Sequence, residues 1–266
     1  MTRPLDGITV VSLEHAIAAP FCTRQLADLG ARVIKIERPG VGDFARAYDT
    51  RVQGQSSHFV WTNRSKESLT LDLKHPQALS ALMKLLARAD VLVQNLAPGA
   101  AARMGLSYEA LHAAWPRLIV CDISGYGDNG PYRDKKAYDL LIQSEAGFLS
   151  VTGTPEAPSK AGISVADIAA GMYAYTNILS ALLLRGRTGE GQHVKVSMLD
   201  CLASMVAEEH FDVMLEHGYS MRSGNYHDRL APFGVYATRD GHVAIVGFTP
   251  AWLDGISIEA LSDSTV

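Results

Sequence analysis

Cysteine, basic charge and long apolar runs are all scarce in this 266-residue sequence. The three cysteines lie far apart, so their spacing supports neither a disulfide framework nor a zinc site and is typical of a reducing compartment. The formal net charge is −4, whereas a chain that wraps nucleic acid usually needs a strongly basic face. The apolar runs are too short to predict a membrane span, and the polar start does not resemble a signal peptide. We therefore expect a cytoplasmic protein that binds neither nucleic acid nor membrane.

Several catalytic motifs are also missing from the sequence. The turn after the first predicted strand reads HAIAAP at 15–20, not G-x-G-x-x-G, which argues against a bound dinucleotide. Neither a G-x-S-x-G elbow nor a Walker A loop occurs, so hydrolase and kinase functions lose their usual support. His210 and His217 lie seven residues apart, a spacing that favours a solvated helix face over a metal site. Small residues before a helix can still admit another phosphate-bearing ligand.

Strands and helices alternate through most of the chain. This alternation predicts an α/β fold with an open parallel sheet and helices on both of its faces. We expect one domain over residues 1–217, a linker over 218–231, and the start of a small second domain with a hairpin over 232–266. The predicted strands are 8–13, 31–37, 91–94, 118–124 and 193–197, and the predicted helices are 20–29, 76–88, 108–115, 138–149, 168–184 and 199–216.

One aspartate, Asp167, precedes a long apolar pattern that runs from Ile168 to Leu184. The pattern predicts a buried helix, and aspartate is among the residues favoured as N-cap of such a helix. A carboxylate held by helix amides stays ionised near neutral pH, and in a ligand cleft it can act as a nucleophile. The capping role and the catalytic role are compatible, and both stay open at this point.

Basic side chains recur at the ends of the predicted elements. Each one alone is explained by surface solubility. Cations at the carboxyl ends of several parallel strands can together hold a polyphosphate through charge-assisted hydrogen bonds. The residues are Arg38, Lys74, Arg103, Lys135 and Lys136.

Seven blocks of sequence follow one another in a characteristic order. They are PLDGITVV at 4–11, LADLGARVIKIE at 26–37, LTLDLK at 69–74, DVLVQN at 90–95, RMG at 103–105, SGYG at 124–127 and GRTGEGQ at 186–192. Over about residues 3–247 they resemble the class III coenzyme A transferases, a family that includes formyl-CoA transferase and shares its fold with α-methylacyl-CoA racemases. The resemblance implies a CoA-binding α/β domain and, for full-length members, homodimers of two interlocked rings.

The resemblance also implies where the substrates bind. Asp167 matches the catalytic aspartate of the transferases, and Tyr138 and Asp139 are expected near the acyl substrate. CoA and acyl-CoA are substrates, so neither a separate cofactor nor a metal is expected. The positions that match the CoA groove are Ala16, Ile17, Ala18, Arg38, Lys74, Asn95, Leu96, Arg103, Met104 and Lys136.

The implied reaction moves CoA from a donor such as succinyl-CoA to a small mono- or dicarboxylic acid. The aspartate attacks the thioester to give a mixed anhydride and then an aspartyl-CoA thioester. Racemisation is the alternative, but that branch has a histidine where this chain has Tyr138, and tyrosine is a poor base at neutral pH.

Two departures from the family pattern leave a third alternative. RSGNYH at 222–227 stands where formyl-CoA transferases have a glycine-rich flap, so formate and oxalate specificity is not supported. Family members also continue well beyond the position of Val266. The third alternative is therefore a non-catalytic remnant that binds CoA.

Overall fold

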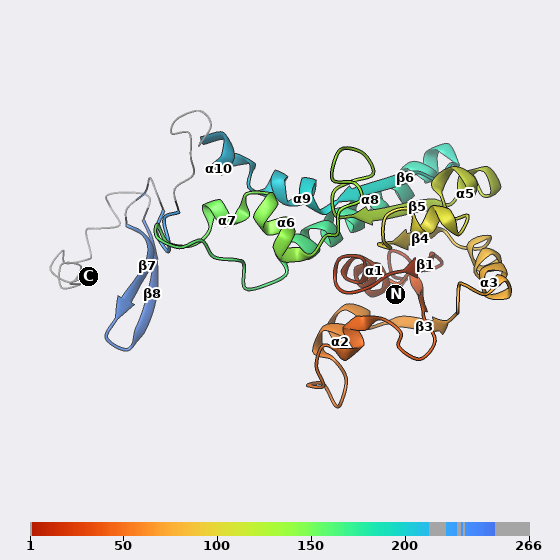
Figure 1. The fold of residues 1–266 in the computed structure, drawn as a ribbon, viewed down its shortest axis with the longest axis horizontal. Coiled ribbons are helices and arrows are strands. Elements are labelled where there is room, and N and C mark those ends of the chain that lie inside the picture. The colour runs from red at the N-terminus through yellow and green to blue at the C-terminus, as the bar shows by residue number, and fades with distance from the viewer. Residues whose placement is uncertain (1, 213–221, 228–229, 231, 248–266) are drawn as a thin grey trace. The chain divides into compact units, whose positions relative to one another are not determined.

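The computed structural model describes residues 2–212, 222–227, 230 and 232–247 (Figure 1). Its contacts divide the chain into two compact units, Met1–Ala146 with Gly162–Ala207, and Gly147–Ala161 with Glu208–Val266. The second unit thus includes a segment that the sequence placed in the first domain. The expected boundary at 217 and much of the expected linker over 218–231 lie outside the described residues.

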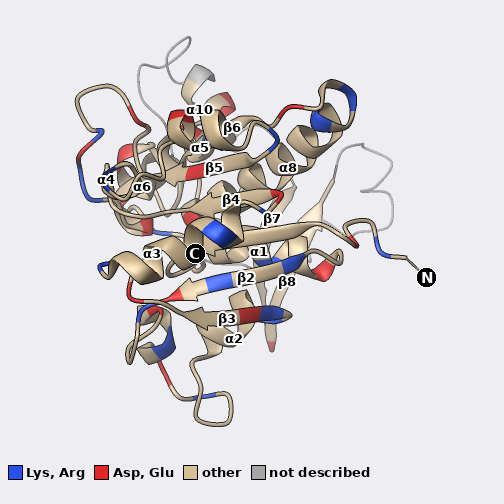
Figure 2. Ribbon diagram, turned by 90° about the vertical axis from the view of Figure 1, so that its right-hand side faces the viewer, with Lys and Arg blue, Asp and Glu red and all other residues tan. Residues whose placement is uncertain are grey.

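Six parallel strands form the sheet of the first unit, in the order β3-β2-β1-β4-β5-β6. The α/β prediction is confirmed. One strand was not predicted, because Lys66, Glu67 and Ser68 give β3 a polar pattern; it lies at an edge, and Figure 2 shows the charged positions on β2 and β3. The strands are β1 (Thr9–Leu13), β2 (Arg32–Glu37), β3 (Lys66–Thr70), β4 (Val91–Gln94), β5 (Ile119–Ser124) and β6 (His193–Ser197).

Helices cover both faces of this sheet, as expected when successive side chains of a buried strand point to opposite sides. Val11 and Leu13 pack in a core cluster with Leu82 and Leu86 of α3 and Leu111 of α5. Helices α1 and α8 pack against each other. The helices of this unit are α1 (Ala18–Asp28), η1 (Phe44–Ala47), α2 (Ser57–Asn63), α3 (Pro76–Leu86), α4 (Ala100–Arg103), α5 (Tyr108–Ala114), α6 (Asp139–Glu145), α8 (Val165–Thr188) and α9 (Met198–Met205).

The helix α8 is longer and less buried than the sequence predicted. It packs on α1, α9 and β6, yet the side chains of Met172, Tyr173, Leu183 and Leu184 are exposed. By length and composition alone, α8 is the one helix among the described residues that is able to cross a membrane, a property that core helices share. The exposed apolar side chains leave one part of α8 uncovered in this chain.

The second unit contains a short helix α7 (Phe148–Val151) and a hairpin of β7 (Phe233–Thr238) and β8 (Gly241–Val246), as predicted for the hairpin. A single helix over 138–149 is wrong: α6 ends at Glu145 because Gly147 adopts φ of +80°, a left-handed conformation that ends helices. The predicted helix over 199–216 divides at Val206, and α10 (Ala207–Asp212) follows. Residues 213–216 of that prediction lie outside the described part of the chain.

Candidate active site

Most of the predicted CoA-binding residues follow the carboxyl ends of the parallel strands. Ala16 follows β1, Arg38 follows β2, Lys74 follows β3, Asn95 follows β4 and Lys136 follows β5. Because the carboxyl ends of parallel strands meet at one edge of a sheet, the fold brings these positions to a common edge. This edge is where open α/β sheets bind their ligands.

The turn between β1 and α1 is held by side chains from two other loops. Asn95 clamps His15: its Oδ1 accepts from the His15 N–H at 2.9 Å, and its Nδ2 donates to the His15 carbonyl at 3.0 Å. Asp43 Oδ1 accepts from the Ala16 N–H at 3.2 Å. Ala16 itself has φ of +62°, in the left-handed region that residues other than glycine rarely adopt. Asn95, predicted to contact CoA, thus also fixes the turn that the CoA is expected to cross.

Helix α1 begins at the end of this turn, and its first amides point out of the helix. The N-cap residue is Ile17, whose side chain offers no acceptor. The Asp167 carboxylate accepts a hydrogen bond from the Ala18 N–H instead. Asp167 therefore caps α1 from another helix, which supplies one of the partners that a helix N-terminus lacks.

The predicted capping of α8 by Asp167 is wrong. Ser164 is the N-cap of α8, and Asp167 is the third residue of the helix. The first amides of α8 are satisfied from α6, since Asp139 Oδ1 accepts from the Ala166 N–H at 2.8 Å and from the Asp167 N–H at 3.3 Å. Asp139 is thus a remote cap, and its carboxylate lies close to that of Asp167.

This arrangement changes the protonation of Asp167. Burial, together with the like charge of Asp139, raises the pKa of Asp167 to about 7, while the hydrogen bond from Ala18 opposes the rise. The expectation that helix amides keep this carboxylate fully ionised at neutral pH is therefore wrong. At pH 7 the carboxyl group is divided between its two forms, and it is mostly ionised only at a pH above about 7.

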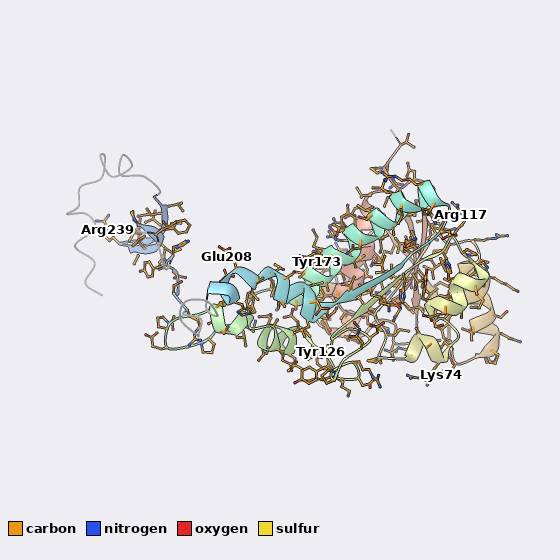
Figure 3. All side chains as sticks on the ribbon, turned by 90° about the horizontal axis from the view of Figure 1, so that it is seen from above. Lys74, Arg117, Tyr126, Tyr173, Glu208 and Arg239 are labelled. Carbon is orange, nitrogen blue, oxygen red and sulfur yellow. The ribbon has the colours of Figure 1, made fainter. Side chains whose placement is uncertain are left out.

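The basic residues around this edge are exposed to solvent. The four side chains of Arg38, Lys74, Arg103 and Lys136 are all exposed, and Figure 3 shows Lys74 at the outer margin of the first unit. Lys135 forms an ion pair with Glu145 and lies 4.5 Å from the centre of the Tyr132 ring. The charge of Lys135 is thus balanced by Glu145, and the role of the other four side chains in CoA binding stays a prediction.

The remaining predicted residues lie in the same loops. Leu96 directly follows Asn95, and its N–H donates to Gln94 Oε1 at 2.7 Å. Met104 is the C-cap of α4, after Arg103. Tyr138 is the N-cap of α6, and its side chain is 65% exposed, so it is open to a ligand rather than packed in the core.

Sequence reasoning missed two groups of residues. Tyr48 follows η1; its pKa is raised by burial and by the charges of Asp43 and Asp167, which places its hydroxyl in the electrostatic field of the site. The loop around Tyr48 carries no periodic signal that could have identified it. A cluster of buried charged side chains behind the turn was also missed, although a lysine such as Lys35 in the middle of a predicted buried strand is an unusual residue that signals it. The described residues contain no group of three side chains suited to a metal ion.

Comparison with known proteins places this geometry in a family. The chain is 38% identical over 250 residues to the succinate–glutarate CoA-transferase of Agrobacterium fabrum, covering 91% of this chain and 62% of that protein. It is 39% identical over 239 residues to the acetyl-CoA:oxalate CoA-transferase of Acetobacter aceti, covering 89% of this chain and 61% of that protein. The chain thus spans about three fifths of the length of these relatives.

Among solved structures, a CAIB/BAIF family protein from Brucella suis superimposes with a TM-score of 0.86 at 37% identity. The match covers 92% of this chain and 66% of that protein. The family model described as CoA-transferase family III matches residues 5–256. The family model, the relatives and the shared parallel-sheet fold together show that the chain belongs to CoA-transferase family III.

Proposed function

We propose that this chain is the CoA-binding, nucleophile-bearing part of an enzyme that transfers CoA from an acyl-CoA to a small mono- or dicarboxylic acid. The observation that carries the proposal is the Asp167 carboxyl group, held by the Ala18 N–H at the turn after β1. Relatives named as succinate–glutarate and acetyl-CoA:oxalate CoA-transferases support this class of substrate. Succinyl-CoA is the donor that we would test first.

CoA would cross the β1–α1 turn, with Ala16, Ile17 and Ala18 beneath it. Their small or apolar side chains let a ligand approach the backbone closely. The exposed guanidinium and ammonium groups of Arg38, Arg103, Lys74 and Lys136 would bind the phosphates through charge-assisted hydrogen bonds. Met104 and Leu96 would supply apolar contact at the edge of the groove.

The transfer would proceed in four steps that regenerate Asp167. Its ionised carboxylate attacks the thioester carbonyl, the C–S bond breaks, and a mixed anhydride and CoA thiolate result. The thiolate attacks the aspartyl carbonyl and releases the donor acid, which leaves an aspartyl-CoA thioester. The acceptor carboxylate then attacks this thioester and expels the thiolate. In the last step the thiolate attacks the acceptor acyl carbon, which gives the new acyl-CoA and free Asp167.

The surroundings of Asp167 suit such a nucleophile. The Ala18 N–H favours the ionised carboxylate and would also stabilise negative charge on an Asp167 oxygen in a tetrahedral intermediate. Asp139 fixes the first turn of α8 and raises the basicity of Asp167. Tyr138, exposed beside Asp139, would contact the acyl group or the acceptor.

Chemical trapping tests the proposal. The chain is incubated with succinyl-CoA and hydroxylamine, and peptides are analysed by mass spectrometry. We expect an aspartyl hydroxamate at Asp167, because hydroxylamine intercepts both the anhydride and the thioester. Asp167→Ala should abolish the label while CoA still binds in calorimetry. Asp134→Asn, which alters an exposed aspartate, is the matched control and should keep the label.

Other outcomes identify the alternatives. A chain that exchanges the α-deuterium of a 2-methylacyl-CoA without labelling Asp167 would be a racemase. A chain that binds CoA with neither label nor exchange would be a non-catalytic remnant. Retention of more than about a tenth of the transfer rate in Asp167→Ala would remove Asp167 from the mechanism.

We also propose that the protein is cytoplasmic, as the scattered cysteines indicate, and, from the family resemblance, that the full-length form is a homodimer. The exposed apolar side chains of α8, among them Leu183 at 71% exposure, support an association surface on this helix.

A further inference from the structure

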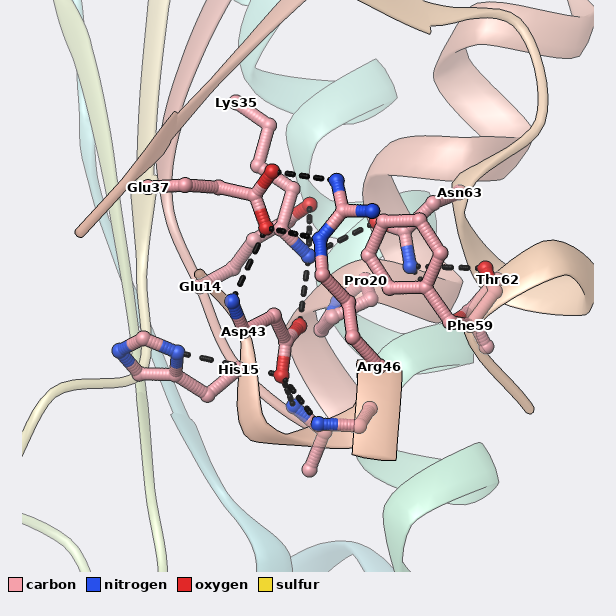
Figure 4. A network of polar contacts seen from close by, with 12 residues as sticks. Glu14, His15, Pro20, Lys35, Glu37, Asp43, Arg46, Phe59, Thr62 and Asn63 are labelled. Atoms are coloured by element: carbon pink, nitrogen blue, oxygen red, sulfur yellow. Dashed lines mark hydrogen bonds and ion pairs between the residues drawn. The ribbon is translucent and has the colours of Figure 1, made fainter. Parts of the chain in front are cut away.

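A cluster of buried charged side chains lies behind the β1–α1 turn (Figure 4). Lys35 Nζ donates to Asp43 Oδ2 at 2.6 Å and to Asn63 Oδ1 at 2.8 Å. Lys66 Nζ donates to Glu14 Oε1 at 2.7 Å. Glu14 and Asp43 are fully buried, and Lys35 is 1% exposed. The fold thus keeps two ammonium and two carboxylate groups inside the protein.

Such a cluster needs an explanation beyond stability. Removing an ion from water costs several kcal/mol, and apolar residues of similar volume often replace a buried ion pair without loss. Burial lowers the pKa of Lys66 to about 8, although the Glu14 charge opposes this change. The charges are therefore kept in place against an unfavourable environment.

The cluster reaches the proposed active site at Asp43. Asp43 Oδ1 accepts from the Ala16 N–H at 3.2 Å and from the Ala45 N–H at 2.9 Å, while Oδ2 accepts from Lys35. Only a side chain in which both terminal atoms accept hydrogen bonds can bind the two N–H groups and the Lys35 ammonium group at once. An asparagine cannot do so, because one side of its amide is a donor.

The residue that Asp43 holds is Ala16, whose φ of +62° is strained for a residue with a Cβ atom. Such a conformation costs on the order of 1 kcal/mol and persists only where its surroundings impose it. Two residues further along the chain, the Ala18 N–H donates to Asp167. The conformation at Ala16 thus sets the direction in which the first amide of α1 points.

We propose that Asp43, oriented by Lys35, is a positioning residue for the proposed CoA transfer: it imposes the left-handed turn at Ala16 that aims the Ala18 N–H at the Asp167 carboxyl group. The part of this inference that concerns CoA rests on the proposed function. The part that concerns Asp167 does not, because the protonation of that carboxyl group can be measured in the chain alone.

The test compares Asp43→Asn with the double variant Asp43→Asn plus Lys35→Met. In the single variant the amide oxygen faces the Lys35 ammonium, so the NH2 group faces the Ala16 N–H and the turn loses its acceptor. In the double variant the ammonium is gone, and the oxygen is able to turn back to Ala16. Methionine keeps most of the length of the lysine stem and adds no charge.

The first readout is the pKa of Asp167, which is measured by a pH titration of its carboxyl carbon in 13C NMR. Loss of the Ala18 hydrogen bond should raise this pKa by about half a unit or more in the single variant. Electrostatics alone predicts the opposite, because the unbalanced Lys35 charge favours an ionised Asp167. The other titratable groups that face Asp167, namely Asp139 and Tyr48, are unchanged in both variants.

The second readout is CoA binding by calorimetry. We expect Asp43→Asn to weaken binding about tenfold and the double variant to return to within about threefold of the original affinity, as for loss and recovery of one buried hydrogen bond. Asp90→Asn is the matched control. It disrupts the ion pair with Arg185 and a contact to the Thr9 N–H at the opposite end of β1, and it should change neither readout.

The outcomes separate this inference from the proposed function. An Asp167 pKa that falls or stays constant in Asp43→Asn, or that does not recover in the double variant, overturns the positioning role. An original chain that binds no CoA overturns the proposed function, while the NMR titration still decides the role of Asp43.

Discussion

Replacing Asp167 by asparagine should stabilise the fold at alkaline pH and leave its stability unchanged at acid pH. The pKa of Asp167 is raised from 3.8 to about 7, first by burial and then by the charge of Asp139. A raised pKa means that the folded chain holds the Asp167 proton more tightly than the unfolded chain. The ionised carboxylate therefore destabilises the folded state. Asparagine has no charge and does not cause this destabilisation.

The magnitude follows from the size of this shift. About three pKa units, at about 1.4 kcal/mol each, give about 4 kcal/mol, and the partial exposure of Asp167 reduces our expectation to about 2 kcal/mol. The destabilisation is absent below the unfolded pKa, grows as pH rises from about 4 to 7, and is complete above about pH 7. The asparagine oxygen can still accept from Ala18, so the cap on α1 is kept.

Urea unfolding at several pH values between 4 and 8, followed by tryptophan fluorescence, measures this difference, since Trp61 and Trp115 of the first unit are two of the three tryptophans. We expect equal stability of the two proteins near pH 4 and an advantage of about 2 kcal/mol for Asp167→Asn at pH 8. Asp134→Asn removes an exposed charge and should show no such pH-dependent gain. A stability difference between the two proteins that is constant with pH, or a less stable Asp167→Asn at pH 8, would refute the argument that ionised Asp167 destabilises the folded state.

Three further predictions concern the site. Asp139→Asn keeps an acceptor for the Ala166 N–H but removes the like charge, so the pKa of Asp167 should fall. The rate of hydroxylamine trapping, which rises with pH, should then rise at a lower pH. An unchanged pH profile would contradict an effect of the Asp139 charge on Asp167. Asn95→Ala removes both hydrogen bonds to His15 and should lower the free energy of unfolding by about 1 to 3 kcal/mol in urea titrations. Arg38→Ala and Arg103→Ala should each weaken CoA binding by about 1 to 3 kcal/mol, with a smaller effect on dephospho-CoA; equal affinity in calorimetry would leave both as ordinary surface residues.

The sheet was predictable because its signals are local. Val10, Val11 and their neighbours form a short apolar run that is bounded by turns, and β4 and β5 begin with similar runs, whereas β6 alternates between polar and apolar residues. The strand β3 has neither pattern, because Glu67 and Ser68 are exposed at the edge of the sheet and Lys66 donates to Glu14 inside the fold. The break between α6 and α7 depends on the conformation of Gly147, which a helical pattern does not reveal.

The position of the candidate nucleophile was also predictable, but its environment was not. An aspartate before an apolar helix indicates a cap, and the sequence places Asp167 at the start of α8 correctly. Which helix it caps depends on α1, almost 150 residues earlier in the chain, and its own helix is capped by Asp139 from α6. Sequence spacing carries no information on such pairings. The raised pKa follows from these remote contacts and could not be inferred without them.

Three carboxylates lie around the turn, and each accepts a hydrogen bond from a backbone N–H group. They differ in the charges that surround them. Asp43 is balanced by Lys35 and holds a backbone conformation. Asp139 satisfies two amides of α8 and is thereby fixed beside Asp167. Asp167 accepts from the Ala18 N–H, and burial together with the charge of Asp139 raises its pKa to about 7, so both of its protonation forms are present at neutral pH. In the proposed transfer, formation of an acyl bond at an Asp167 oxygen would remove this buried negative charge and so relieve its repulsion by Asp139.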